Sequence, residues 1–585
     1  MLVLRVPWVL TVLRGRLISI GKRVFPGSDG ADGPRYPAFH GLAILLKVVG
    51  SSLWPKELSK LSIVCGLNLC CLLLSAGLLV SAQDLQEPPK KAQEFQELQK
   101  KVGEFILTNG LHFIVLERHE SPVLSFHTWV NVGSVQDPAG DTGLARMFEH
   151  LAFKGTETIG TRGWPEERKA LDAIEEAYDR VEAEANKGVK ADPMRVDMLR
   201  TQVRIASDNA QRLGAASEYR RILEENGAVE LNASASTVVT EYSCSLPSNR
   251  TELWFLMESQ RLLRPAFREF YRERELMLEE YRQRVEGDPL ARMMAELLAA
   301  AFKVHPYRNP SGGWPGDILN LRRTHAQAFF DRYYVPGNIT VAIVGDVTAA
   351  NVRHLAERYF GSMAARPMPP LVTTREPPQL GPKTVAIEMS GPPLAMIGYK
   401  RPSQYDQDDL PLDMIQILLS QGRMGTLYSE LVQEKRIAQQ AQAIATNPDD
   451  RFPNLFVFLL APAPGHTVEE NRRALEELLE RFKSREPDPL LFARAKAQQR
   501  ASLIGRMTSN RELARRLALY SAGYGDWRKL FTTLDDLNLV TPQGVQRAAS
   551  RCFVATGRTT VYTVLPGQSD APPPKPPERK TGGPQ

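Results

Sequence analysis

Short apolar runs alternate with turn signals where the folded body of the chain begins. Three such runs, FILTNG, LHFIVLER and VLSFHTWVNVG, lie between residues 105 and 133 and predict two or three strands. Asn109-Gly110 separates the first two, and this dipeptide favours a tight hairpin turn. The pair Asp141-Thr142 then offers an N-cap for a helix through LARMFEHLAF at residues 144–153.

Residues 164–225 have a different pattern, with apolar side chains at helical spacings of three and four on two separate arms. The first arm carries Leu171, Ile174, Tyr178, Val181 and Ala185, and the second carries Leu199, Val203, Ala206, Ala210 and Leu213. Gly188 and Pro193 lie between the arms. The pattern predicts an antiparallel helical hairpin inserted into the first domain, with its charged faces turned to solvent.

The rest of the body reads as mixed helix and strand. A strand-like stretch at Leu231–Leu246 precedes helices at 252–263 and 267–286, and ITVAIV at 339–344 is typical of a buried strand. A similar turn and apolar strand, again after an amphipathic helix, recurs at residues 553–567. We therefore expect an α+β fold made of two related domains, residues 103–365 and 370–568, preceded by a linker at 83–102.

Residues 1–82 read as a leader. Residues 61–80 hold no charged side chain, Lys56 and Lys60 precede them, and Val80-Ser81-Ala82 is a small-residue cleavage pattern. This predicts a secretory signal cut after Ala82 and a periplasmic or secreted protein, with an uncleaved membrane anchor as the alternative. Residues 1–57 read as an extension upstream of the true start. The Pro-rich tail at 569–585 is typical of disorder.

Composition narrows the function classes. The formal charge of +6 arises within residues 1–60, which hold nine Lys/Arg and three Asp/Glu, so the remaining chain is neutral. The body therefore gives no electrostatic argument for nucleic-acid binding. Only Cys244 and Cys552 lie beyond the leader, which excludes a Cys-based zinc site and a disulfide framework there and favours buried free thiols.

Candidate chemistry gathers on one helix. Arg146, Glu149 and His150 share a helical face, and a His in place of Arg146 would complete H-x-x-E-H, the inverted zinc-peptidase motif. In that motif two imidazoles bind zinc and the Glu acts as general base. Glu273 and Glu280 are seven residues apart on a later helix, so either could supply a carboxylate ligand, with Glu279 competing with Glu280.

These residues bring out a resemblance to the pitrilysin/insulinase family of zinc metallopeptidases, in its bacterial two-domain form with a helical insert. The matching pieces run in family order from about 105 to 567: TGLARMFEHLAFKGT, LNAS at 231–234, REFYRERELMLEEYRQR, HPYRNPSGGW and YYVPGNITVAIVGDV. The resemblance implies two homologous α+β domains that close as a clam around a peptide chamber.

The resemblance also implies site roles by position. His150 resembles the second zinc ligand, Glu149 the general base, Glu280 the distal ligand and Glu273 its supporting carboxylate. Asn232 and Ala233 resemble the edge strand that pairs with the backbone of a bound peptide, and Tyr428 resembles a substrate contact. Zinc is the implied cofactor and peptides are the implied ligands.

Two departures from the family pattern change the expected activity. Arg146 stands where the family has its first histidine, and a guanidinium has no lone pair for a metal and stays protonated. At about 4 Å it would repel a further unit of positive charge by about 4 kcal/mol at an effective dielectric of 20. In the second half, Thr426 stands where relatives often have Arg, and that half holds no H-x-x-E-H of its own.

Three functions are compatible with this pattern. The first is a peptidase-like protein with an impaired site, acting as partner subunit of a zinc-bearing relative, because the family includes two-subunit arrangements with one degenerate member. Its partner could be such a catalytic subunit or a second copy of the chain, and a membrane would be involved only if the leader is uncleaved. The second is an active zinc endopeptidase with an altered metal site. The third is a peptide-binding or scaffold protein without enzymatic activity.

Overall fold

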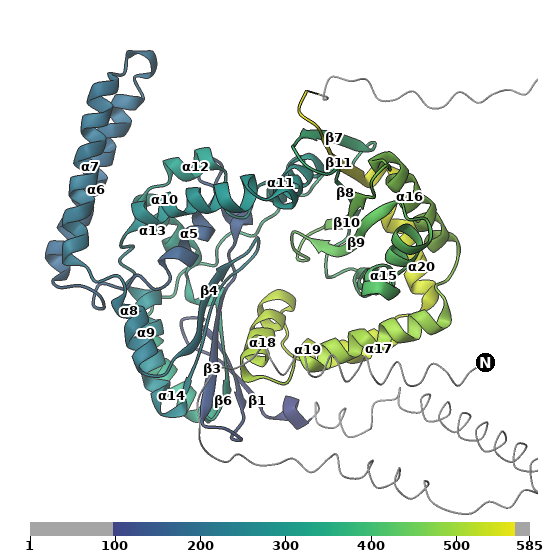
Figure 1. Ribbon diagram of the computed structural model, residues 1–585. Helices are drawn as coiled ribbons and strands as arrows, with labels where there is room; N and C mark the ends of the chain where they lie inside the picture. Colours follow the sequence, from purple (N-terminus) through teal and green to yellow (C-terminus); the bar gives the residue numbers. More distant parts are fainter. Residues whose placement is uncertain (1–96, 568–585) are drawn as a thin grey trace, which may run out of the picture. The chain divides into compact units, whose positions relative to one another are not determined.

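The computed structural model describes residues 97–567, which form two mixed β-sheets with helices around them (Figure 1). The predicted signal segment at 61–80, the cleavage point after Ala82 and the tail at 569–585 lie outside the described residues. Within the predicted linker, residues 97–100 form one helical turn. Across residues 97–567, every helix is too short or too polar to cross a membrane.

The first sheet has the strand order β1-β2-β6-β3-β5-β4. Its strands are β1 (Val102–Ile106), β2 (His112–Glu117), β3 (Val123–Val130), β4 (Val229–Ala235), β5 (Thr240–Pro247) and β6 (Ile339–Gly345). β2 and β6 are parallel and the other pairs are antiparallel. β6 is buried along its whole length, as expected of an apolar strand with neighbours on both sides. The stretch predicted as one strand at 231–246 is instead the hairpin of β4 and β5, because residues 236–239 turn the chain.

The second sheet repeats this topology. Its strands are β7 (Lys383–Glu388), β8 (Ala395–Arg401), β9 (Ala438–Asn447), β10 (Asn454–Pro462) and β11 (Arg558–Val564). Their order, β7-β11-β8-β10-β9, is that of β2-β6-β3-β5-β4 in the first sheet, and β7 and β11 form the single parallel pair of this sheet. The prediction of two related α+β domains is thus confirmed by strand order and direction.

The helices also follow one order in the two halves of the body, which we call the N-terminal half (up to residue 365) and the C-terminal half (from residue 370). The N-terminal half has α5 (Leu144–Leu151), α6 (Trp164–Ala185), α7 (Pro193–Leu213), α8 (Glu218–Glu225), α9 (Thr251–Leu263), α10 (Phe270–Tyr281), α11 (Pro289–Ala301), α12 (Pro315–Asn320), α13 (Arg323–Tyr333) and α14 (Ala349–Phe360). The C-terminal half has α15 (Asp409–Ser420), α16 (Val468–Ser484), α17 (Pro489–Gly505), α18 (Asn510–Tyr524), α19 (Lys529–Leu539) and α20 (Pro542–Cys552). In each half, five helices lie between the last two strands in chain order, α9–α13 between β5 and β6 and α16–α20 between β10 and β11.

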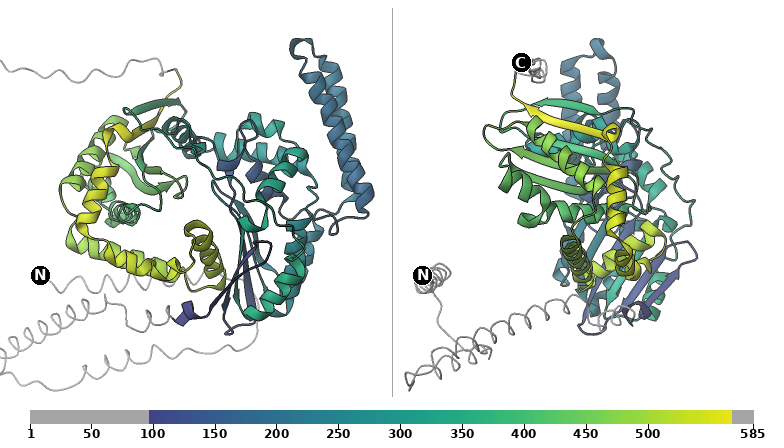
Figure 2. Two further views of the ribbon diagram at one scale, coloured as in Figure 1. Left: turned by 180° about the vertical axis from the view of Figure 1, so that it is seen from behind. Right: turned by 90° about the vertical axis from the view of Figure 1, so that its right-hand side faces the viewer.

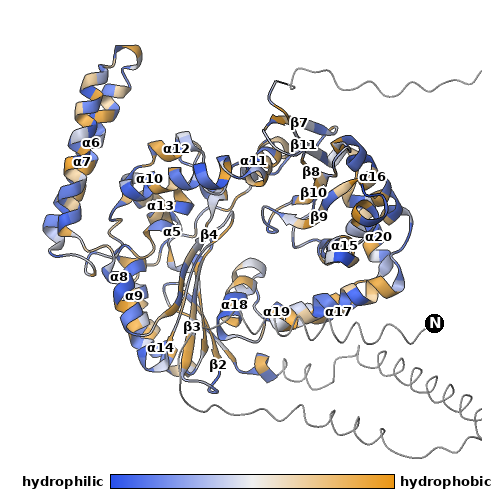
Figure 3. Cartoon of the chain, viewed as in Figure 1, coloured by the Kyte–Doolittle hydropathy of each residue, from blue (hydrophilic) through white to orange (hydrophobic). Residues whose placement is uncertain are grey.

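The helical hairpin predicted at 164–225 is present as α6 and α7, with α8 leading back to the sheet. The two arms lie side by side and extend away from the sheet and its covering helices (Figures 1 and 2). Leu171, Ile174, Leu199 and Val203 are buried between or beneath the arms, whereas Ala185 is exposed near the tip. Hydrophilic residues are spread along both arms, while the strands of the first sheet are mostly hydrophobic (Figure 3).

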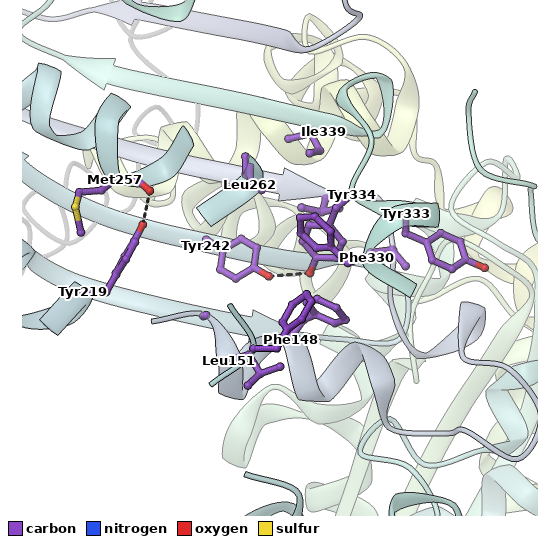
Figure 4. Packing of buried hydrophobic residues seen from close by; sticks show 14 of the residues in the cluster. Phe148, Leu151, Tyr219, Tyr242, Met257, Leu262, Phe330, Tyr333, Tyr334 and Ile339 are labelled. Carbon is purple, nitrogen blue, oxygen red and sulfur yellow. Dashed lines mark hydrogen bonds between the residues drawn. The ribbon is translucent and has the colours of Figure 1, made fainter. Parts of the chain in front are cut away.

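An aromatic core fixes the orientation of α5. Phe148 and Leu151 point from α5 into this core, where the Phe148 ring lies 4.8 Å from that of Tyr334 (Figure 4). The hydroxyls of Tyr242 and Tyr334 are 2.7 Å apart, so these buried polar groups satisfy each other. Burying this face of α5 leaves Arg146, Glu149 and His150 on the opposite side of the helix.

The two halves exchange one helix each. α18, from the C-terminal half, packs Leu513 and Leu517 against Ile114, Leu116 and Trp129 of the first sheet. α11, from the N-terminal half, packs apolar side chains against the second sheet, and these contacts join Met293, Leu297, Met396, Leu455 and Val457. Each half thus covers one face of the other's sheet with apolar side chains, and this burial stabilises their association.

Candidate functional site

A cavity of about 810 Å³ opens beside the exposed face of α5. Its walls come from α5, the edge strand β4, α10 with the π-helix Arg282–Glu286 that follows it, and the segment joining α7 to α8. Its lining residues are Arg146, Glu149, His150, Phe153, Lys154, Gln211, Gly214, Ala216, Ser217, Arg220, Leu231, Asn232, Ala233, Glu269, Arg272, Glu273, Glu280 and Arg284. The pocket brings together every predicted site residue except Tyr428.

The start of α5 differs from the predicted Asp141-Thr142 cap. Gly143 is the N-cap and has a φ of 103°, a conformation that residues with a Cβ rarely adopt. The carboxylate of Asp137 accepts hydrogen bonds from the backbone N–H groups of Gly143 and Ala145 at 2.8 and 2.9 Å. A carboxylate at this end also matches the positive end of the helix dipole. Thr142 instead donates its hydroxyl to Asp317, at 2.6 Å.

Arg146 lies at the centre of the pocket and joins two carboxylates. Its Nη1 is 2.6 Å from Glu149 Oε2, and its Nη2 is 2.9 Å from Glu280 Oε2. Glu149 Oε2 also accepts the backbone N–H of Ala235 in β4, at 2.9 Å. The guanidinium therefore holds the two carboxylates that the family resemblance assigns to the general base and the distal ligand.

His150 is held from α10. Its Nδ1 lies 3.1 Å from Glu273 Oε2, while its Nε2 lies 3.7 Å from Glu280 Oε2 and has no hydrogen-bond partner. Lys154, one turn further along the chain, places Nζ 2.6 Å from Glu273 Oε1 and 2.7 Å from Glu269 Oε2. Helices α5 and α10 thus face each other through alternating opposite charges.

Local charge sets the ionisation of the two acidic groups on α10. Burial opposes ionisation of Glu273, but hydrogen bonds from His150 and Lys154 outweigh it and lower the pKa of this carboxyl. The pKa of Glu280 is also lowered, because the hydrogen bond from Arg146 and the positive charge of its neighbours together outweigh its partial burial. Conversely, Glu269 and Glu273 raise the pKa of Lys154 despite desolvation. All three groups are charged at neutral pH.

The remaining predicted residues divide between the pocket and another region. Glu280 faces the pocket, whereas Glu279 is half exposed and pairs with Arg282 outside it. Asn232 and Ala233 lie on β4, at the end of the strand order, so one edge of their backbone has no neighbouring strand within the sheet. Tyr428 begins the π-helix Tyr428–Glu434 in the C-terminal half and is not among the lining residues.

The side chains present do not fit the three-ligand zinc site of the family motif. Arg146 occupies the place of the first ligand, and its guanidinium already binds the oxygens that a metal would need. Within residues 97–567, no group of three or more His, Cys, Asp or Glu side chains is arranged to hold a metal ion. Both cysteines of this range are buried and free, as expected.

Several pocket residues were not identified from the sequence. Lys154 and Glu269 complete the charge pairing, and Arg220, Arg272 and Arg284 lie at its mouth. Glu269 could not be identified because α10 begins at Phe270 rather than Phe267, and both Phe267 and Glu269 have left-handed backbones, with φ of 50° and 57°. Lys154 offered one signal, since it follows His150 by four residues, although it lies just beyond the end of α5.

Comparison with known proteins places this site in a family. The model described as Insulinase (Peptidase family M16) matches residues 113–185, and that described as Peptidase M16 inactive domain matches residues 320–499. The zinc protease PqqE of Helicobacter pylori is 26% identical over 471 residues, which cover 78% of this chain and 91% of that protein.

Solved structures share the fold. A protease from Helicobacter pylori superposes with a TM-score of 0.66 at 24% identity, covering 79% of this chain and 99% of that one. A peptidase M16 inactive domain from Pseudomonas fluorescens gives a TM-score of 0.61 at 14% identity, with coverages of 79% and 98%. The family models, the relative and the shared fold agree with the residues around the pocket, and the chain carries domains of the insulinase/pitrilysin (M16) family of peptidases.

Proposed function

We propose that this chain is a peptide-binding member of its family whose zinc chemistry is disabled, and that it acts as partner subunit of a zinc-bearing relative. The observation that carries the proposal is the pair of contacts from Arg146 to Glu149 and Glu280. A metal would have to displace a permanent cation and would then find only His150 and Glu280 of the usual ligands. The guanidinium balances these carboxylates as zinc would in an active relative.

The peptide-binding part of the proposal rests on what the site retains. β4 still presents an open strand edge beside the pocket, and an extended peptide can add to such an edge through backbone hydrogen bonds. The cavity is large enough for side chains of such a peptide. A chain that binds peptides without cleaving them suits a subunit that helps form a substrate chamber. The leader predicted at residues 1–82 supports a periplasmic or secreted location for that role.

Zinc content tests the proposal directly. The purified chain and its Arg146→His variant are each dialysed against zinc-containing buffer, and metal is counted by elemental mass spectrometry. We expect no bound zinc in the native chain and about one zinc per chain in the variant, the stoichiometry of a restored mononuclear site. Near-stoichiometric zinc in the native chain, with peptide cleavage that Glu149→Gln abolishes, would establish the active-peptidase alternative instead.

The partner is tested separately. The tagged chain is purified from its native host, and co-purifying proteins are identified by mass spectrometry. A stoichiometric relative with an intact H-x-x-E-H motif, whose peptidase activity rises when the chain is added back, supports the subunit role. Peptide binding without any such relative would leave the scaffold alternative.

A further inference from the structure

We propose that the pocket selects peptides with an acidic side chain, and that Arg220, Arg272 and Arg284 recognise that charge. This inference rests on the proposed peptide-binding function and names its ligand class. It follows from the distribution of charge over the pocket. We call the less exposed lining residues Arg146, Lys154, Glu269 and Glu273 the floor, and the three more exposed arginines the mouth.

The floor of the pocket is saturated with internal ion pairs. The side chains of Glu273, Glu269 and Arg146 are 6%, 14% and 18% exposed, and each is bound to an oppositely charged neighbour. Lys154 contacts two of these carboxylates. Breaking such pairs would leave charges uncompensated in a partly buried place, so the floor is a poor receptor for a further charge.

The most exposed charged side chains that line the pocket are positive. The side chains of Arg220, Arg272 and Arg284 are 45%, 64% and 67% exposed. Each makes a single carboxylate contact, to Glu224 at 3.1 Å, Glu269 at 3.4 Å and Glu280 at 3.8 Å. A guanidinium has five N–H donors, so each of these arginines keeps donors for an incoming carboxylate.

The helical insert supplies part of this mouth. Arg220 lies on α8, and its guanidinium is 4.8 Å from the centre of the Phe153 ring, which holds it over the pocket through a cation–π contact. Gln211, Gly214, Ala216 and Ser217, from the same returning segment, complete that wall. The hairpin thus does more than extend from the domain, because its base positions a charged residue at the site.

The geometry of strand pairing connects the two features. Successive side chains of a peptide paired with β4 would alternate between the two faces of the sheet. Those on the α5 side would point toward the pocket, where the mouth arginines meet them before the floor does. An aspartate or glutamate gains ion pairs at that position, whereas a lysine meets three like charges.

Binding of matched peptides tests the inference on the full chain. The probes are three fluorescein-labelled peptides of alternating Thr and Val that differ in one central residue, Glu, Gln or Lys, and binding is measured by fluorescence anisotropy. We expect the Glu peptide to bind about tenfold more tightly than the Gln peptide, as two or three partly exposed ion pairs would give, and the Lys peptide to bind most weakly. Because the contacts are exposed, added salt should reduce the preference.

Neighbouring arginines provide matched controls. Arg220→Gln and Arg284→Gln should each reduce the preference for Glu over Gln about threefold, the effect of one exposed ion pair. Arg221→Gln and Arg282→Gln remove the same charge from the same segments, but these residues pair with glutamates outside the pocket and should leave the preference unchanged.

The outcomes separate the two proposals. Binding that is equal for the Glu and Gln peptides, or a preference that Arg221→Gln lowers as much as Arg220→Gln does, would overturn the acidic selection and leave peptide binding intact. Failure of all three peptides to bind would overturn the proposed peptide-binding function itself.

Discussion

The two halves of the molecule have one topology but treat the corresponding helix pair differently. In the N-terminal half, α5 and α10 face each other through the ionised side chains of Arg146, Lys154, Glu273 and Glu280. In the C-terminal half, Gln421, which directly follows the corresponding α15, donates a hydrogen bond to Gln498 of the corresponding α17. The same fold thus places paired charges at this position in one half and a hydrogen bond between amides in the other.

The side chains that hold the edge strands β4 and β9 also differ between the halves. Glu149 accepts the backbone N–H of Ala235 in β4, while Ser420 accepts that of Ala443 in β9, at 2.6 Å. Gln416 accepts a second N–H of β9, from Ala445, at 3.0 Å. A side-chain oxygen from the helix thus holds the edge strand in both halves. Because a hydroxyl or an amide suffices for that purpose, holding the edge strand does not by itself require the charges of the N-terminal half.

The largest effect is expected where the halves are most alike, at the exchanged helices. Leu297 of α11 and Leu517 of α18 are fully buried against the other half's sheet. Replacing either by Ala should lower the free energy of unfolding by about 3 kcal/mol, since lost apolar contacts and a cavity act together. Urea denaturation followed by circular dichroism gives both values, with the partly exposed Leu290→Ala as the control. A large cost at one site and almost none at the other would show that the exchange is not reciprocal.

Much of this fold could be predicted from local patterns in the sequence. The spacing of apolar residues at 171–181 and 199–210 identifies α6 and α7, and the run at 339–344 identifies the central strand β6. These patterns predict the elements well because all the apolar positions of each pattern lie within a single helix or strand. The exchange of α11 and α18 could not be predicted, because an apolar helix face does not specify which sheet will cover it.

The site shows the same limit. The shared face of residues on one turn of α5 could be predicted from the sequence, because helical geometry relates them. The same holds for the spacing of Glu273 and Glu280 on α10. Arg220 reaches the pocket only through the return of the insert, and Asp137 caps α5 from six residues before the N-cap. Contacts of this kind depend on tertiary structure, and no local spacing indicates them.

A smaller effect should separate the charged helix pair from the neutral one. Arg146→Met removes the cation between Glu149 and Glu280 and should lower the free energy of unfolding by about 1–2 kcal/mol, less than for a fully buried pair. Gln421→Met, in the C-terminal half, should change it by less than about 0.5 kcal/mol. Both are measured by chemical denaturation with a chelator present, so that no metal replaces the lost charge. Equal costs would mean that the two helix pairs depend on their polar contacts to the same extent.

The smallest effect is a difference in pH dependence. Because contacts with His150 and Lys154 lower the pKa of Glu273 below its ordinary 4.5, its stabilisation is present above about pH 4.5 and is lost as the pH falls through the lowered pKa. Glu273→Gln should therefore be about 1 kcal/mol less stable than the native chain at pH 7, and the difference should shrink towards zero on acidification. Glu279→Gln on the same helix, whose native carboxylate is half exposed, should match the native chain at every pH. A Glu273→Gln deficit that persists in acid would assign the cost to lost packing rather than to the charge of the site.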